Sequence, residues 1–185
     1  MTTIAKHWRL ISLTALILSA GWMALTALFF PSGTGGRIPA PRQGFLAPDF
    51  ELTTLEGQTV QLSRLQGQPV IVNFWATWCA PCKAEMPAMQ RVYQQYRDQG
   101  LVILAVNATN QDSRQAAADF ASQYNLTFSI LLDTSAEAAR QYQVRALPTT
   151  FFIDRAGNIH DVIVGGPMSE GLLRAQAEQM LAEVP

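Results

Sequence analysis

The sequence has few of the residues that bind metal ions or cross-link small folds. Its 185 residues include two cysteines and two histidines. Two cysteines are too few for a disulfide-rich scaffold or a four-thiolate zinc site. The histidines, His7 and His160, lie far apart in the chain, so we expect no histidine-rich metal site. Motifs that bind nucleotides, haem or flavin are also missing, and the sequence therefore predicts no cofactor and no metal.

An excess of charge of either sign is missing too. The chain has 13 lysine and arginine residues against 14 aspartate and glutamate residues, a net charge of −1. This balance creates no field that would attract nucleic acid, so we expect no nucleic-acid partner. Charged residues make up 15% of the chain and apolar residues 49%, which excludes a wholly disordered protein. The low charged fraction has a local cause at the N-terminus.

Residues 10–30 form one long apolar run without a charged side chain. As a helix this run would be about 31 Å long, which matches a hydrocarbon core of that thickness. Lys6 and Arg9 precede it, and no lysine or arginine follows until Arg37. Because positive residues stay on the cytoplasmic side, residues 1–9 should be cytoplasmic and the rest of the chain outside. We therefore expect a single-pass signal anchor in the cell membrane.

A cleaved signal peptide is the main alternative to this anchor, and a buried helix of a soluble domain is a third. The apolar part of a signal peptide normally has about 7–15 residues and ends at a small-x-small cleavage site. This run is longer, and Phe29-Phe30-Pro31 is a poor cleavage context. Both the anchor and the signal peptide would export the chain from about residue 31 onward.

The exported part divides into a linker and one folded domain. Residues 31–44 are rich in proline and glycine and predict a flexible linker, and the domain is expected at 45–185. Apolar runs and turn residues predict strands at 49–53, 59–62, 70–75, 101–106, 128–132, 149–153 and 159–164. Helical patterns predict helices at 79–99, 113–124, 135–142 and 169–181. Gly100 is expected to end the first of them, and Asp112 or Ser113 to be the N-cap of the second. This order favours a mixed α/β sheet with helices on both faces, preceded by an N-terminal β-hairpin.

The two cysteines form the motif Cys79-Ala80-Pro81-Cys82, directly after a predicted strand and at the start of a predicted helix. Two thiols at this spacing in a first helical turn can approach disulfide distance. Free backbone N–H groups and the helix dipole stabilise a thiolate, so we expect a lowered pKa for Cys79. Cys82 lies one turn deeper and is expected to be the resolving thiol. A static disulfide closing so small a ring would stabilise little, and a metal site would need two further ligands.

A second motif, Ala146-Leu147-Pro148-Thr149-Thr150, precedes a predicted strand. Together the two motifs resemble the membrane-anchored, thioredoxin-fold thiol–disulfide oxidoreductases of the ResA/TlpA-like family. The matching stretches are APDF at 47–50, VNFWATWCAPCKAEMP at 72–87 and ALPTTF at 146–151, and the resemblance extends over 45–181. It implies a thioredoxin-like fold with a mixed central sheet.

The resemblance also implies roles by position. Cys79 would attack a substrate disulfide, Cys82 would resolve the mixed disulfide, and the pair would form the redox-active disulfide. Pro148 would be a cis-proline facing the cysteines, although only about 5–6% of such bonds are cis in proteins at large. The substrate-binding surface would comprise Trp78, Pro81, Leu147 and Pro148, while Trp75 is expected to pack in the core.

Glu85 matches the acidic residue that family members place close to the thiols. It follows Cys82 by three residues and so shares a helix face with it. In a partly apolar site its pKa would be raised and it could move protons, whereas a solvated first-turn glutamate is the alternative. Where thioredoxin has a buried aspartate, this chain has Asn73, which cannot titrate. Proton transfer would then fall to Glu85 or to water.

The family implies an extracytoplasmic dithiol reductase for exported proteins, including apocytochrome c before haem attachment. Its electron donor would be a polytopic membrane protein, and a monomer is expected. A peroxiredoxin is one alternative, but its Pro-x-x-x-Thr-x-x-Cys pattern is not met, since Thr77 is two residues before Cys79. A copper-delivery module is another, but such relatives space their cysteines one residue further apart and add a histidine. A disulfide donor is a third, because the Ala80-Pro81 pair does not decide the direction of electron flow.

Overall fold

The structure, a computed structural model, describes residues 38–182 of the chain. The predicted anchor at residues 10–30 and residues 31–37 of the predicted linker lie outside the described residues. Within residues 38–182, no helix has the length and apolar composition needed to cross a bilayer. The transmembrane helix therefore stays a prediction.

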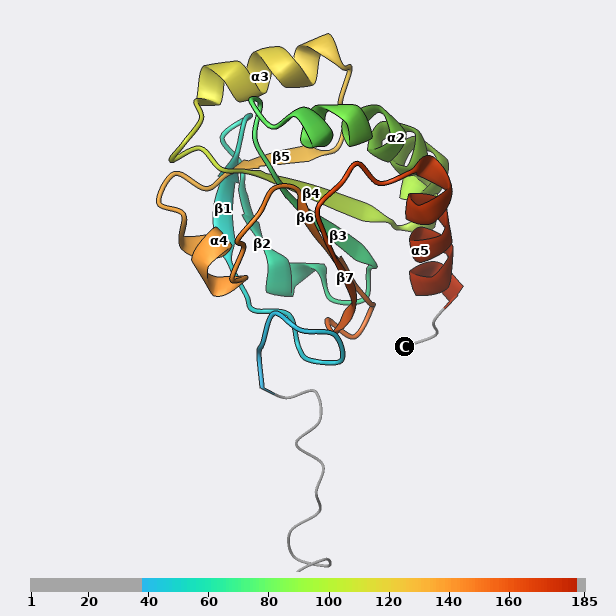
Figure 1. Ribbon diagram of the computed structural model, residues 1–185. Helices are drawn as coiled ribbons and strands as arrows, with labels where there is room; N and C mark the ends of the chain where they lie inside the picture. Colours follow the sequence, from blue (N-terminus) through green and yellow to red (C-terminus); the bar gives the residue numbers. More distant parts are fainter. Residues whose placement is uncertain (1–37, 183–185) are drawn as a thin grey trace, which may run out of the picture. The chain divides into compact units, whose positions relative to one another are not determined.

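One seven-stranded mixed sheet forms the centre of the domain, with the strand order β2-β1-β5-β4-β3-β6-β7 (Figure 1). The strands are β1 (Glu51–Thr54), β2 (Thr59–Gln61), β3 (Val70–Trp75), β4 (Val102–Asn107), β5 (Ser129–Leu132), β6 (Thr149–Ile153) and β7 (Ile159–Val164). The pairs β3–β4 and β4–β5 are parallel, and the other neighbours are antiparallel. The predicted mixed sheet and N-terminal hairpin are confirmed.

The helices are α2 (Ala80–Tyr96), α3 (Arg114–Gln123), α4 (Glu137–Gln141) and α5 (Glu170–Ala182), with 3-10 turns at Leu62–Leu65 and Arg97–Gln99. The 3-10 turn at Leu62–Leu65 was not predicted, because four residues are too few to show a helical period. Of the two caps considered for α3, the structure selects Ser113, whose hydroxyl oxygen accepts a hydrogen bond from the Ala116 N–H at 3.1 Å. α2 continues through Pro87, and the chain leaves its last turn at Gly100 with φ 97°.

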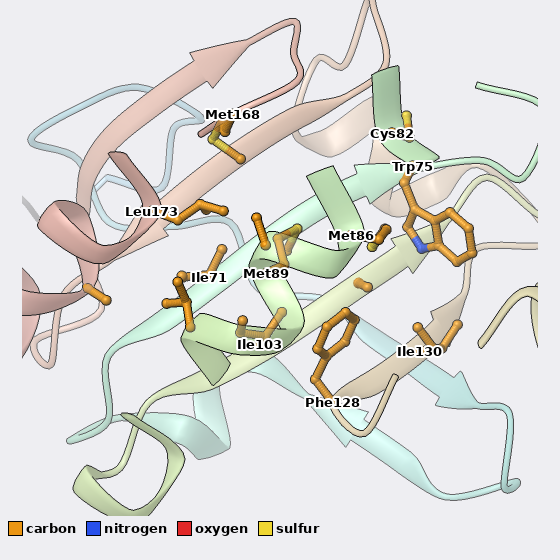
Figure 2. Packing of buried hydrophobic residues seen from close by; sticks show 14 of the residues in the cluster. Ile71, Trp75, Cys82, Met86, Met89, Ile103, Phe128, Ile130, Met168 and Leu173 are labelled. Carbon is orange, nitrogen blue, oxygen red and sulfur yellow. The ribbon is translucent and has the colours of Figure 1, made fainter. Parts of the chain in front are cut away.

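The sheet buries side chains on both faces. On one face α2, α3 and α5 pack against alternate strand residues, among them Ile71, Trp75, Ile103 and Ile130. Figure 2 shows this cluster, with Cys82, Met86 and Met89 of α2 and Leu173 of α5 gathered against the strands. On the other face, α4 and the segment before β1 pack against Val70, Val72, Phe74, Leu104 and Val106. Helices on both faces were predicted from the alternation of strands and helices, and this is what the structure has.

The topology places the cysteines at one edge of the sheet. Because β3, β4 and β5 are parallel, their carboxyl ends meet at this edge, and α2 starts there directly after β3. β6 is antiparallel to β3, with Phe74 paired to Thr149 and Val70 to Ile153. The start of β6, which follows Pro148, therefore lies at the same edge as the start of α2.

The opposite edge holds the segment that leads into β1. Its backbone is bonded to the start of β7 and to the turn before it: Gly44 N–H donates to Ile159 O at 2.8 Å, and Ala47 N–H donates to Gly157 O at 2.9 Å. Residues 38–44, which belong to the predicted linker, are thus in contact with the domain where the structure describes them. The cysteines lie a strand length away from this segment.

Candidate active site

Cys79 and Cys82 are joined by a disulfide with an S–S distance of 2.06 Å and a Cα–Cα distance of 5.3 Å. Cys79 is the N-cap of α2, and the Cys82 N–H lies 3.3 Å from Cys79 Sγ. Cys79 keeps 5% of its surface exposed, whereas Cys82 is fully buried. Cys79 is therefore the more exposed of the two cysteines, and a backbone donor at the helix start can stabilise negative charge on its sulfur after reduction.

Pro148 follows a cis peptide bond from Leu147, as the resemblance implied. Pro148 is buried and Leu147 is half-buried. The carbonyl oxygen of Pro148 accepts a hydrogen bond from the Gly165 N–H at 2.8 Å. This bond ties the start of β6 to the turn that follows β7.

The turn after β7 contains a second cis peptide, between Gly166 and Pro167, which was not predicted. Gly166 lies between two residues of the candidate site. A β-carbon added at this position would be 2.7 Å from Glu85 Oε2 and 2.7 Å from Pro148 Cγ. Contacts this short leave room for glycine alone. No local signal in the sequence revealed this role, because the contacts are made by residues distant in the chain.

Glu85 is fully buried on α2. Its Oε1 accepts a hydrogen bond from Asn73 Nδ2 at 2.9 Å, and its Oε2 accepts one from the Met168 backbone N–H at 3.1 Å. Burial raises the pKa of Glu85 above its ordinary value, and the bonds from Met168 and Asn73 oppose that rise. The prediction of a carboxylate with a raised pKa in an apolar site is confirmed, and the alternative of a solvated first-turn glutamate is wrong.

Glu85 and the buried Cys82 lie on the same helix, α2. Glu85 lies three residues after Cys82, and side chains at this spacing are neighbours. Within residues 38–182, no lysine, arginine or histidine forms an ion pair with Glu85. Glu85 is therefore a buried carboxyl group with a raised pKa and no cationic partner among the described residues.

The two tryptophans near the motif have different environments. Trp78 is 55% exposed, and its indole N–H donates to the Gln111 carbonyl oxygen at 3.1 Å. Trp75 is fully buried and packs against Phe120, with ring centroids 5.0 Å apart. Trp78 and Ala80 are thus exposed on either side of Cys79, while Trp75 belongs to the core, as expected.

Asp112 holds the segment before the cysteines in place, and sequence analysis missed this role. Its carboxylate accepts hydrogen bonds from the Thr77 N–H at 2.7 Å, the Thr77 hydroxyl at 2.8 Å and Asn107 Nδ2 at 2.9 Å. Burial raises the pKa of Asp112, but these bonds outweigh it, and the pKa is lowered overall. The sequence suggested Asp112 only as a helix cap, because the residue it binds is far away in the chain.

The comparisons with known proteins agree with this geometry. Residues 44–162 match the AhpC/TSA family. The chain belongs to this family. It is 38% identical over 173 residues to the thiol-disulfide oxidoreductase ResA of Geobacillus kaustophilus, covering 91% of this chain and 95% of that protein. It is 44% identical over 125 residues to the thioredoxin-like protein YneN of Bacillus subtilis, covering 67% and 72% of the two chains.

Solved structures of family relatives have the same fold. StoA from Bacillus subtilis superposes with a TM-score of 0.62 at 32% identity, covering 70% of this chain and 96% of that one. A thiol:disulfide interchange protein of the thioredoxin family from Chlorobium tepidum gives a TM-score of 0.65 at 28% identity, covering 74% and 96%. This AhpC/TSA member is therefore a ResA-like thiol–disulfide oxidoreductase with a thioredoxin-like fold and a Cys79–Cys82 disulfide.

Proposed function

We propose that this ResA-like protein is a membrane-anchored, extracytoplasmic reductase of disulfides in exported proteins. The observation that supports it most is the difference between its two cysteines: Cys79 keeps 5% of its surface exposed, whereas Cys82 is fully buried, three residues before the buried Glu85 on the same helix. A large disulfide substrate can reach only the first, and the second is placed to end the reaction. The apolar run at residues 10–30 supports the anchor and the export of the domain.

The reaction transfers two electrons from the dithiol to the substrate. The Cys79 thiolate attacks one sulfur of the substrate disulfide, and the other substrate sulfur leaves as a thiolate that takes a proton from water. Cys82 then attacks Cys79 Sγ, and the second substrate sulfur leaves in the same way. The substrate ends as a dithiol, and the protein ends with the Cys79–Cys82 disulfide.

In the second step, Glu85 accepts the proton that the Cys82 thiol loses. Cys82 is buried away from water, so its thiol needs a nearby acceptor before it can attack. Glu85 lies one turn along the same helix and takes this proton as Cys82 becomes nucleophilic. When the disulfide is reduced again, Glu85 returns the proton to the Cys82 sulfur.

The substrate surface consists of Trp78, Pro81, Leu147 and Pro148. Trp78, which precedes Cys79, is exposed, and the cis-proline lies at the start of β6, at the same edge of the sheet as the start of α2; both support docking of an extended substrate segment there. An apocytochrome c with a Cys-x-x-Cys-His disulfide is the substrate we expect, by its family relation to ResA proteins. Oxidised protein would be reduced again by a polytopic membrane protein that passes electrons across the bilayer. The protein would act as a monomer.

A single-turnover assay tests the reaction. The reduced full chain in detergent micelles is mixed with an oxidised Cys-x-x-Cys-His peptide, and products are followed by alkylation and mass. We expect Cys82→Ser to accumulate the mixed disulfide with the peptide and Cys79→Ser to be inactive. A Cys82→Ser variant that forms no mixed disulfide would contradict the proposal.

A redox titration tests the direction of electron flow. The protein is equilibrated with graded thiol and disulfide buffers, and tryptophan fluorescence reports its state. A midpoint at or below about −220 mV supports a reductase, whereas one near about −120 mV would identify a disulfide donor.

Extraction of native membranes at alkaline pH tests the anchor, since a protein with a transmembrane segment stays in the pellet.

A further inference from the structure

Asn73 links Glu85 to the sheet. It lies on β3 opposite Thr150 of β6, and its side chain is fully buried. Its Nδ2 group lies 2.9 Å from Glu85 Oε1 and 2.9 Å from Thr150 Oγ1. Both hydrogens of the amide are therefore used, one on each neighbour.

The amide oxygen of Asn73 has no such partner. Asn73 Oδ1 is buried and accepts no hydrogen bond from any described residue. Glu85, in turn, receives N–H donors on both oxygens, from Asn73 and from Met168. An ionised carboxylate only accepts hydrogen bonds, so this environment fits the charged form.

The protonated form of Glu85 fits less well. A protonated carboxyl must donate its O–H, and the two groups that face it are donors themselves. Asn73 could offer Oδ1 only by turning its amide over. That rotation would bury the NH2 group without an acceptor, which costs free energy. The arrangement thus favours the carboxylate, against the effect of burial.

We infer that Asn73 is a positioning residue of the redox site, whose amide fixes Glu85 Oε1 and keeps the carboxylate ready to take the Cys82 proton. This inference rests on the proposed role of Glu85 in thiol exchange. Asn73 itself neither takes nor gives a proton. An amide at this position also avoids a second carboxylate, with which Glu85 would have to share one proton.

Other charged and titratable groups on the surrounding elements face elsewhere or belong to the redox pair. Glu170, at the start of α5, binds Arg91 and Arg174. Asp161 of β7 accepts from Gln176, and Asp112 after β4 accepts from Thr77. Lys83 of α2 is exposed. His160 of β7 lies 3.3 Å from Gln179, measured from Nε2 to Oε1. Among the described residues, the hydrogen bonds of the Glu85 carboxyl group come from Asn73 and Met168.

In the step concerned, the Cys82 S–H bond breaks and its proton moves to the Glu85 carboxylate. The electron pair on Cys82 Sγ forms the bond to Cys79 Sγ, and the bond between Cys79 Sγ and the substrate sulfur breaks. The substrate sulfur leaves as a thiolate. If Asn73 were absent, more of Glu85 would be protonated at a given pH, and fewer molecules would be able to accept the proton.

Rapid mixing of the reduced full chain in detergent with one equivalent of dithionitrobenzoate separates the two thiol steps. The first coloured thiolate is released when Cys79 attacks, and the second when Cys82 resolves the mixed disulfide. The rate of each release is measured over a series of pH values. The pH at which the second rate is half-maximal is an apparent pKa of the Cys82 thiol and the Glu85 carboxyl group acting as a pair.

We expect Asn73→Leu to raise this midpoint by about one pH unit and to leave the first release unchanged. Asn73→Ser should raise the midpoint in the same way, because the serine hydroxyl is too short to reach Glu85. This variant replaces Asn73→Leu in the experiment if the leucine variant does not fold. Thr150→Val is the matched control, because it removes the other partner of Asn73 and keeps the bond to Glu85. Its midpoint should equal that of the unmodified chain.

An unchanged midpoint in a folded Asn73 variant would overturn the inference, and so would an equal shift in Thr150→Val. Glu85→Gln separates this failure from failure of the proposed function. If Glu85→Gln slows the second release and shifts its midpoint while the Asn73 variants behave like the unmodified chain, Glu85 keeps its role and only the role of Asn73 is wrong. If Glu85→Gln has no effect on the second release, the proton role of Glu85 is wrong.

Discussion

Gly166 packs directly against the ring of Pro148: a β-carbon at position 166 would lie 2.7 Å from Pro148 Cγ and equally close to Glu85 Oε2. The cis-proline expected to bind substrate and the carboxylate expected to move protons therefore share one neighbour. The turn after β7 also bonds to both, through the Gly165 N–H to Pro148 O and the Met168 N–H to Glu85 Oε2. A change in this turn must affect both parts of the site.

We predict that Gly166→Ala lowers the free energy of unfolding by about 1–3 kcal/mol, because the added methyl group overpacks the site. It should also slow peptide reduction. Gly171→Ala is the matched control, since a β-carbon at that position of α5 meets nothing within 4 Å. Urea unfolding measures the stability of both variants. A Gly166→Ala chain as stable as the control would contradict the prediction, because the turn would then accommodate the added methyl group.

The two tryptophans should respond in opposite ways to truncation. Trp75→Ala is expected to cost about 3–5 kcal/mol of stability, because a fully buried ring leaves a cavity. Trp78→Ala should change stability little but lower kcat/KM for peptide reduction about tenfold through lost docking area. Thermal unfolding and steady-state assays measure the two effects. Equal kcat/KM values for the Trp78 variant and the unmodified chain would remove Trp78 from the docking surface.

Asp112→Asn should loosen the segment that presents Trp78 and Cys79. An asparagine has only one acceptor oxygen for the three donors of Thr77 and Asn107, and its own NH2 group would face at least one of them. We therefore expect the free energy of unfolding to fall by about 1–3 kcal/mol near neutral pH. Asp119→Asn is the control, because Asp119 is exposed on α3 and accepts from Gln115 on the same surface. The control should stay within about 0.5 kcal/mol of the unmodified chain.

The cost of Asp112→Asn should depend on pH with a definite sign. Because the folded pKa of Asp112 lies below its ordinary value of 3.8, its contribution is fully present above that value and is lost as pH falls through the folded pKa. The stability difference between the variant and the unmodified chain should therefore shrink in acid. Unfolding free energies at several pH values give the result, and a difference that grows toward low pH would contradict it.

Glu85 should produce the opposite dependence. Its folded pKa is above the ordinary value of 4.5, so the folded chain binds more protons than the unfolded chain between the two pKa values. The stability of the oxidised protein relative to Glu85→Gln should be greatest below pH 4.5 and fall as pH rises through the folded pKa. Urea unfolding of the two oxidised chains across this range measures the difference. A relative stability that rises with pH would mean that the Glu85 pKa is lowered.

Local patterns were enough to predict most of the architecture. The run at Val70–Trp75 predicted a buried strand, and Gly100 predicted the end of the long helix, because burial on both faces and a left-handed backbone each leave a signal in a few neighbouring residues. The short 3-10 turn at Leu62–Leu65 left none. The cis bond at Pro148 was predicted through the family resemblance, whereas the one at Pro167 had no comparable motif.

The sequence by itself determined the chemistry: two cysteines three positions apart at a helix start, with a glutamate on the same face, define a dithiol with a nearby carboxylate. Only the tertiary structure decided how that carboxylate behaves. Its burial and its donors come from Asn73 on β3 and Met168 before α5, and its close neighbour is Gly166 after β7. Desolvation and hydrogen bonding depend on which segments the sheet brings together, and residues 83 positions apart in the chain, such as Glu85 and Met168, leave no local pattern from which that contact can be inferred.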